Sequence, residues 1–122
     1  MQLNHLDLSV PDVPAAVSFF ETAFGFTLLQ TKGNDGMAIL RGDGGVVLVL
    51  TRAAPTPGPL YPKTFHIGFL LPSEAAVWDA FQRMKTAGIE LPQEPRSMRG
   101  SLTFYCHAPG GILVEVGHRP MD

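Results

Sequence analysis

The feature that most constrains the fold is one sequence pattern that occurs twice. The stretch NHLDLSVPD (residues 4–12) corresponds to TFHIGFLLP (residues 64–72), and His5 aligns with His66 at an offset of 61 residues. Four further positions match at this offset: Leu6, Leu8, Val10 and Pro11 align with Ile67, Phe69, Leu71 and Pro72. Two copies of so long a unit predict a duplicated module rather than a solenoid of many short repeats.

The first copy has the pattern of a strand, a helix and three more strands. Asp12 is suited to cap the start of a helix, and Gly25 is suited to end it. Strands are expected at residues 26–31, 37–41 and 46–52, since glycine-rich turns separate these apolar stretches.

The second copy repeats this order. A strand is expected at 64–72, a helix capped by Ser73 at 73–88, an extended segment at 89–95, and strands at 100–109 and 111–117. The residues between the copies, 53–63, include four prolines and therefore predict a stiff linker. The domain organisation is thus module 1 at about 1–52, this linker, and module 2 at about 64–119.

These patterns predict an α+β fold. Two βαβββ modules are expected to form a cupped mixed sheet, with the helices on its outer face. Because each sheet buries one face on a helix, the other faces remain available to form a shared concave surface.

Composition narrows the classes of function. The 122 residues are 45% hydrophobic and carry a net charge of −2, with nine scattered basic residues, so neither nucleic acid nor a membrane surface is an expected partner. A single cysteine excludes an intrachain disulfide and fits a reducing compartment. No signal-peptide pattern or membrane-spanning run is recognised, so the expected location is cytoplasmic.

The two histidines hold equivalent places in the duplicated pattern. By strand alternation, His5 and His66 both point away from the hydrophobic side chains expected to face the helices. A single histidine in such a place is more often an ordinary, partly buried residue. Two imidazoles at equivalent positions on one concave face could instead bind a metal ion, so a metal site is a second hypothesis.

Glu115 is a candidate third ligand. It lies between Val114 and Val116 in the last expected strand and points to the opposite side from them. One interpretation is a strand whose outer face contacts water. The other is a site of two histidines and one carboxylate, which leaves coordination positions open for substrate and for water or dioxygen.

These residues resemble the vicinal oxygen chelate superfamily, which includes glyoxalase I, fosfomycin-resistance enzymes, extradiol dioxygenases and bleomycin-resistance proteins. NHLDLSVPD resembles the opening strand of that superfamily, TFHIGFLL its fifth strand and FYCHAPGGILVEV its closing hairpin. The resemblance covers nearly the whole chain. It implies a divalent metal (Fe, Mn, Zn or Ni) that a small substrate chelates through adjacent oxygens, and it implies a homodimer.

The resemblance places the metal ligands at His5, His66 and Glu115. The position where glyoxalase I carries a further glutamate aligns with Val49, to within one register step, and valine cannot bind a metal. A four-ligand glyoxalase I site is therefore not expected. A metal-dependent lyase, dioxygenase or transferase with three protein ligands is the expected enzyme.

Candidate catalytic and substrate-binding residues also follow from the resemblance. Tyr105 is placed to hydrogen-bond a metal-bound oxygen, or else packs at the rim, and His107 shares its side of the strand. The histidine of the dioxygenase signature is absent, because residues 96–98 are Arg, Ser and Met, which counts against catechol-type ring cleavage. The candidate anion contacts for a phosphonate are Arg52, Arg96 and Arg99. Cys106 has no assigned base and is expected to be a packed thiol.

Two further alternatives stay open at this point. One is a metal-free module that sequesters a small molecule in a groove, as bleomycin-resistance proteins do. The other is a former enzyme whose three polar residues survive as a cluster. The linker leaves open whether the two modules of one site come from one chain or from two.

Overall fold

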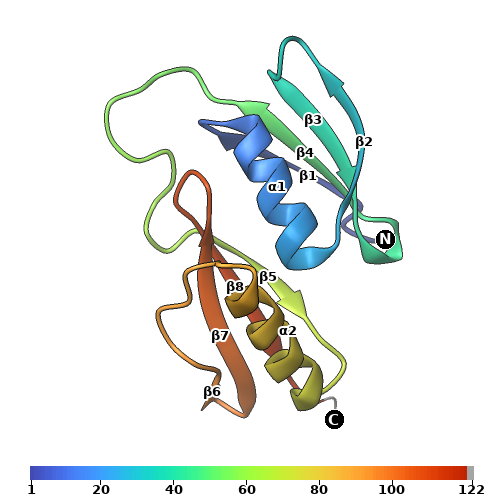
Figure 1. Ribbon diagram of the computed structural model, residues 1–122, viewed down its shortest axis with the longest axis vertical. Helices are drawn as coiled ribbons and strands as arrows, with labels where there is room; N and C mark the ends of the chain where they lie inside the picture. Colours follow the sequence, from blue (N-terminus) through green and yellow to red (C-terminus); the bar gives the residue numbers. More distant parts are fainter. Residues whose placement is uncertain (121–122) are drawn as a thin grey trace. The chain divides into compact units, whose positions relative to one another are not determined.

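The structure, a computed structural model, describes residues 1–120 and divides into two units (Figure 1). Unit 1 comprises Met1–Leu60 with the turn Ala108–Gly111, and unit 2 comprises Tyr61–His107 and the segment from Ile112 onward. Each unit contains one sheet and one helix. The two units are therefore described one at a time.

Unit 1 is a four-stranded mixed sheet covered on one side by a helix (Figure 1). Its elements are β1 (His5–Val10), α1 (Val13–Phe24), β2 (Thr27–Lys32), β3 (Met37–Arg41) and β4 (Val47–Arg52), with a short 3₁₀ turn at Asp43–Gly45. The strand order is β1-β4-β3-β2. The outer strand β1 pairs in parallel with β4, whereas the other two pairings are antiparallel.

Strand alternation explains the core of unit 1. Leu8 and Val10 of β1 and Leu48 and Leu50 of β4 are buried, and Phe20 of α1 is fully buried with them in the hydrophobic core. Asp12 caps α1, because its Oδ1 accepts a hydrogen bond from the amide of Ala15 at 3.1 Å. The other face of the sheet is thus free of the helix and carries His5, Asp7 and Ser9 of β1, all of them exposed.

Unit 2 repeats this plan. Its elements are β5 (His66–Leu70), α2 (Glu74–Thr86), β6 (Arg96–Met98), β7 (Ser101–Ala108) and β8 (Ile112–His118), and the strand order is β5-β8-β7-β6. Again the first strand, β5, pairs in parallel with the last, β8. Ser73 caps α2 by accepting a hydrogen bond from the amide of Ala76 at 3.1 Å.

The core of unit 2 forms between α2 and the buried faces of β7 and β8. Phe81 of α2 meets Phe104 of β7 edge to face, with ring centroids 5.4 Å apart. Ile112, Val114 and Val116 of β8 are fully buried. Glu115 therefore lies on the face of the sheet that the helix does not cover, as strand alternation predicted.

One strand differs from the sequence prediction. The sequence predicts an extended segment at 89–95 and a loop, PRSMRG, at 95–100, but Arg96–Met98 form the edge strand β6, antiparallel to β7. A three-residue edge strand has no apolar alternation to reveal it, because neither of its faces is fully buried.

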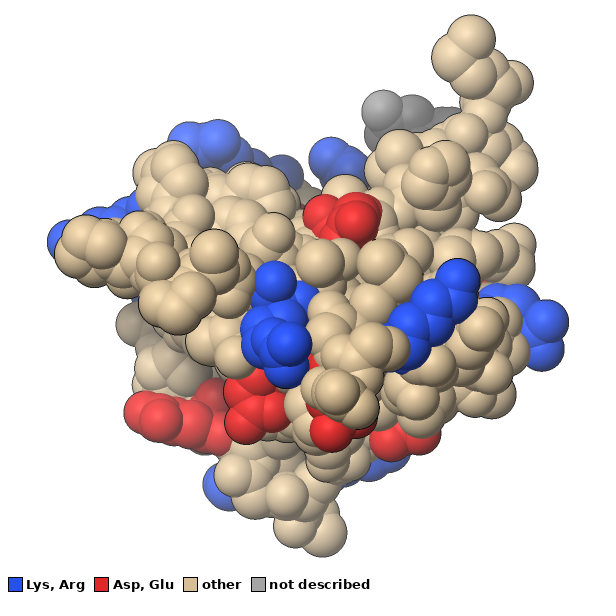
Figure 2. Space-filling model, turned by 90° about the horizontal axis from the view of Figure 1, so that it is seen from above, with Lys and Arg blue, Asp and Glu red and all other residues tan. Residues whose placement is uncertain are grey.

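The predicted fold class is confirmed: the chain is α+β and consists of two βαβββ modules. Neither α1 nor α2, the two α-helices in residues 1–120, is long and apolar enough to cross a membrane. Figure 2 shows Lys and Arg side chains in small separate groups on the face in view, in keeping with their scattered positions along the sequence.

Candidate functional site

The parallel ladders of the two units place their polar residues at equivalent positions. In unit 1, His5 pairs with Val47 and Asp7 with Val49. In unit 2, His66 pairs with Leu113 and Gly68 with Glu115. Val49 is consequently the counterpart of Glu115, and Asp7 is the counterpart of Gly68.

His66 has the geometry of a metal-binding histidine. Its ring is exposed, and its Nδ1 lies 2.9 Å from the carbonyl oxygen of Thr64. A carbonyl oxygen can only accept, so Nδ1 carries the proton and donates it in this hydrogen bond. The lone pair of Nε2 then remains available, which is the arrangement that metal-binding histidines usually have.

Glu115 lies on the same face as His66 and has one oxygen held and one open. The hydroxyl of Tyr105 donates a hydrogen bond to its Oε1 at 2.8 Å. A Cβ on Gly68 would lie 3.6 Å from its Oε2, so the glycine leaves this oxygen uncovered on the β5 side. Tyr105 thus orients the carboxylate of Glu115, and Gly68 leaves its second oxygen accessible.

Tyr105 is a neutral hydrogen-bond donor in this arrangement. The hydrogen bond to Glu115 raises the pKa of the Tyr105 hydroxyl above its ordinary value near 10.0, and burial and the charge of Glu115 add to this effect. The positive charges of Arg96 and Arg99 oppose the shift but do not reverse it. The hydroxyl therefore keeps its proton at neutral pH.

Unit 1 contributes a second pair of donors. His5 and Asp7 are two residues apart on β1 and share the exposed face of their sheet. The Nδ1 of His5 lies 3.4 Å from Oδ1 of Asn4, and the Oγ1 of Thr51 donates a hydrogen bond to Oδ1 of Asp7 at 2.8 Å.

Glu115 and Tyr105 open onto a cavity of about 490 Å³ in unit 2. Arg99 and Arg119 supply positive charge to its lining, and Ser101 and Thr103 supply hydroxyls. Its other lining residues are Leu70, Met98, Gly117 and His118. A volume in this range holds a small organic molecule.

Two of these lining residues, His118 and Arg119, were missed by the sequence prediction. The Nδ1 of His118 hydrogen-bonds the carbonyl oxygen of Leu71 at 3.0 Å, so its Nε2 carries the free lone pair. Both residues lie beyond the last apolar residue of β8, where the alternation of apolar and polar residues ends. Only the position of the strand end relative to β5 and β7 reveals that they line the cavity.

The structure places Arg96 and His107 in different surroundings. Arg96 is exposed on the edge strand β6 and lines a cavity of about 240 Å³ that Tyr105 also lines. His107, two residues beyond Tyr105, is exposed and lines a cavity of about 140 Å³ with Glu90 and Pro92. Arg96 and Arg99 thus lie near Tyr105, whereas His107 lines a cavity that neither Tyr105 nor Glu115 lines.

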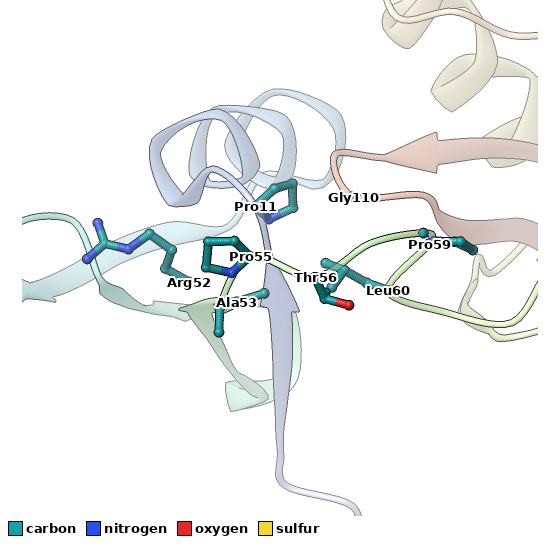
Figure 3. Close-up of a pocket in the computed structure, with 10 residues that line it drawn as sticks. Pro11, Arg52, Ala53, Pro55, Thr56, Pro59, Leu60 and Gly110 are labelled. Atoms are coloured by element: carbon teal, nitrogen blue, oxygen red, sulfur yellow. The ribbon is translucent and has the colours of Figure 1, made fainter.

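Arg52 belongs to unit 1. By strand alternation, Arg52 is on the same side of β4 as the buried Leu48 and Leu50 and on the opposite side from Val49. Its Nη1 donates a hydrogen bond to the carbonyl oxygen of Asn34 at 3.3 Å. Figure 3 shows it beside a cavity of about 550 Å³ lined by the proline-rich segment, with its guanidinium extending away from Pro55 and Thr56.

Cys106 is a packed thiol, as the sequence predicted. Its side chain is fully buried, and burial raises its pKa to about 11. The nucleophilic thiolate is therefore scarce at neutral pH.

Within residues 1–120, no three or more His, Cys, Asp or Glu side chains are grouped so that they could hold a metal ion. The three predicted ligands divide between the units: His5 is in unit 1, whereas His66 and Glu115 are in unit 2. The donor set of two imidazoles and a carboxylate suits a divalent transition metal. The hydrogen bonds of His66 and Glu115 are those expected around such ligands.

Comparison with known proteins gives consistent matches over nearly the whole chain. Residues 2–116 match the family described as the Glyoxalase/Bleomycin resistance protein/Dioxygenase superfamily. An uncharacterised protein of Pseudomonas aeruginosa is 31% identical over 95% of this chain and 87% of its own length. The glutathione transferase FosA of Serratia marcescens is 30% identical over 93% of this chain and 78% of its own length.

A solved structure agrees with these matches. The structure of a possible glyoxalase from Bacillus cereus superposes with a TM-score of 0.80 at 40% sequence identity. The match covers 95% of this chain and 97% of the other.

Proposed function

Because the chain belongs to the Glyoxalase/Bleomycin resistance protein/Dioxygenase superfamily, we propose that it is a metalloenzyme with a His-His-Glu site. His5, His66 and Glu115 hold one divalent metal ion in this proposal, and the substrate is a small molecule that chelates the ion through adjacent oxygens. The bound ion supplies Lewis-acid or redox chemistry to these oxygens. The match to a glutathione transferase supports an enzyme over a purely structural domain.

The observation that carries the proposal is the orientation of the two donors in unit 2. A histidine with Nδ1–H on a carbonyl and a carboxylate with one oxygen held by a tyrosine are both prepared for a ligand. Within residues 1–120, no hydrogen bond is found from Nε2 of His66 or from Oε2 of Glu115 to another protein group, so both atoms are available to a ligand.

The cavity beside Glu115 indicates the class of substrate. Arg99 and Arg119 add two positive charges to a space that Ser101 and Thr103 line with hydroxyls. Guanidinium groups bind carboxylates and phosphates through paired hydrogen bonds. We infer a small anionic substrate whose charged end contacts these arginines while its adjacent oxygens face Glu115. Arg96 is a further candidate for this anion contact.

Tyr105 is the candidate proton-handling residue. Its hydroxyl proton lies on the hydrogen bond to Glu115, and its raised pKa keeps the phenol neutral at the pH of the cell. Tyr105 therefore positions the carboxylate. Because its single hydroxyl proton is donated to Glu115, its oxygen is left to accept a hydrogen bond from a substrate, and general-base catalysis by its phenolate is disfavoured.

Assembly of the proposed site requires one copy of unit 1 and one copy of unit 2, because each supplies part of the ligand set. Both copies can belong to one chain, or two chains can exchange them in a homodimer. A homodimer is part of the proposal, and analytical ultracentrifugation with and without metal tests it.

The direct test is metal content and turnover of the purified full chain, prepared anaerobically and reconstituted separately with Fe(II), Mn(II), Zn(II) and Ni(II). One ion per chain is expected, and activity is expected in a screen of small oxygenated anions, with and without glutathione as a second substrate. His66→Ala and Glu115→Ala are expected to lose both metal and turnover. His107→Ala and Glu94→Gln serve as matched controls that keep the metal.

A second candidate function is the metal-free sequestering module. It predicts that the protein binds small anionic molecules equally well in excess chelator and that His66→Ala changes nothing. That result, or full metal content in Glu115→Ala, contradicts the metalloenzyme.

A further inference from the structure

The turn between β6 and β7 holds an arginine in an unfavourable backbone conformation. Arg99 and Gly100 form this two-residue connection, and their φ angles are 52° and 81°. Two positive φ angles are typical of a type I′ hairpin turn, whose first position favours asparagine, aspartate or glycine. Asn34 and Asp35 also have positive φ, which short polar residues tolerate. Arginine lacks this tolerance, so the backbone at Arg99 is strained.

The side chain of Arg99 lines the cavity of about 490 Å³ in unit 2. Strained residues are concentrated at binding sites, where the surrounding structure maintains them. Arg119 adds a second positive charge to the lining, and Glu115 is the one carboxylate among the lining residues that the structure describes. An anion bound to the guanidinium would account for an arginine at this position of the turn.

Two apolar side chains line the same cavity. Leu70 is 64% exposed at the end of β5, and Met98 is half-buried at the end of β6. These are the two outer strands of the sheet, with β8 and β7 between them. On β8, Gly117 pairs with Leu70, and a Cβ on Gly117 would lie only 2.9 Å from Oγ1 of Thr103. The middle of the sheet therefore carries small residues, and apolar side chains stand on both outer strands.

We propose that this cavity selects an amphipathic anion, whose charged end binds Arg99 and whose aliphatic segment lies between Leu70 and Met98. This inference rests on the proposed function, because it names the class of the small anionic substrate. Glu115 and Arg119 are four residues apart, about 13 Å in an extended chain, so a carbon segment fits between the two ends of the site. Covering the exposed surface of Leu70 favours binding of such a segment.

The simpler interpretation is that Arg99 and Leu70 are ordinary surface residues. Arg99 is exposed, and Leu70 belongs to an edge strand. In that case, replacing Arg99 by a residue that suits the turn raises stability and changes no binding. Stability and ligand affinity therefore separate the two interpretations.

The test is isothermal titration calorimetry of the full chain in excess chelator, with methyl phosphate and butyl phosphate as probes and butylamine as the charge control. Butyl phosphate is expected to bind at least about tenfold more tightly than methyl phosphate, since each buried methylene contributes up to roughly fourfold. Butylamine is expected not to bind. Leu70→Ser is expected to remove most of the difference between the two phosphates and to leave the affinity for methyl phosphate unchanged.

Arg99→Asn separates binding from stability in one variant. It is expected to weaken the binding of both phosphates at least about tenfold, because a charged hydrogen-bond partner is lost. It is also expected to raise the midpoint of urea unfolding, because asparagine suits the type I′ turn. Arg99→Gly, which also suits the turn, is expected to behave in the same way. Arg41→Asn and Leu29→Ser, at exposed side chains of unit 1, are the matched controls and are expected to change neither affinity.

The outcomes distinguish this inference from the metalloenzyme on which it builds. Wild-type phosphate binding in Arg99→Asn, equal affinity for the two phosphates, or no binding of either one overturns the inference. If the chain meanwhile holds one metal ion that His66→Ala loses, the metalloenzyme stands without the inference. If the chain-length dependence is found in a protein that binds no metal, the amphipathic anion site stands and the metalloenzyme fails.

Discussion

The two units of this chain share one backbone plan and differ in the residues on the open face of the sheet. Both begin with a strand whose first residue is a histidine, and both pair that strand in parallel with the last one. The carboxylate of the equivalent ladder pair is Glu115 on the last strand of unit 2 and Asp7 on the first strand of unit 1. The two units therefore have the same register between their first and last strands, but the acidic side chain of the equivalent pair lies on different strands.

The units also differ in what surrounds the open face. In unit 2 a cavity lies beside Glu115, and Arg99 and Arg119 give it positive charge. In unit 1 the proline-rich segment lines a cavity of about 550 Å³, and Arg52 has the same strand alternation as the buried leucines of β4. We therefore propose that unit 2 binds the substrate and that unit 1 contributes metal-binding donors.

The largest expected effects test whether the two cores are equivalent. Phe20 in unit 1 and Phe104 in unit 2 are both buried almost completely. Phe20→Ala and Phe104→Ala are each expected to lower the free energy of unfolding by about 3–5 kcal/mol in urea titrations, through lost burial and the cavity left behind. Leu29→Ala, at a side chain 49% exposed, is the control and should change it by less than about 0.5 kcal/mol. Equal stability of the control and either core variant contradicts this account of the cores.

A smaller effect is expected at the helix starts, where the units use different capping residues in the same way. Asp12→Ala and Ser73→Ala each leave an amide without its side-chain acceptor, so each is expected to lower stability by about 1 kcal/mol. Thermal unfolding of these variants beside Asp12→Asn and Ser73→Thr, which keep a cap, measures the effect. Loss in only one unit indicates that the other helix is held by packing alone.

The smallest expected effect is a change in the titration of Tyr105, which has no counterpart in unit 1. In a Tyr61→Phe background Tyr105 is the only tyrosine, so its ionisation can be followed by ultraviolet absorption. The midpoint is expected above 10, and Glu115→Gln is expected to lower it, because the carboxylate is the main cause of the raised pKa. The raised pKa stabilises the fold below pH 10, and this contribution is lost as the pH rises through the folded-state pKa. A midpoint unmoved by Glu115→Gln contradicts the assigned hydrogen bond.

Much of the fold was predictable because it follows from the alternation of apolar and polar residues in the strands and from the capping and turn residues between elements. The buried and exposed faces of β1 and β8 follow from the apolar residues on either side of His5 and Glu115, and Asp12 and Ser73 mark the helix starts. The strand β6 was not predictable, because three residues at a sheet edge carry no periodic signal.

The candidate site was predictable only in part. His5, His66 and Glu115 follow from the repeat and the family resemblance. The partnership of Tyr105 with Glu115 and the lining role of Arg119 depend on which strands are neighbours, which the sequence does not state. Asp7 is close to His5 in the sequence, but only the ladder register shows that it pairs with Val49, the counterpart of Glu115.

We propose that His5, His66 and Glu115 together bind one divalent metal ion. The most direct test is to measure how much metal the full chain holds at equilibrium. Inductively coupled plasma mass spectrometry of the wild type, each single alanine variant and His107→Ala gives the answer. One ion per chain is expected in the wild type and in His107→Ala, and a loss of bound ion is expected in all three ligand variants. A ligand variant that keeps one ion per chain contradicts it.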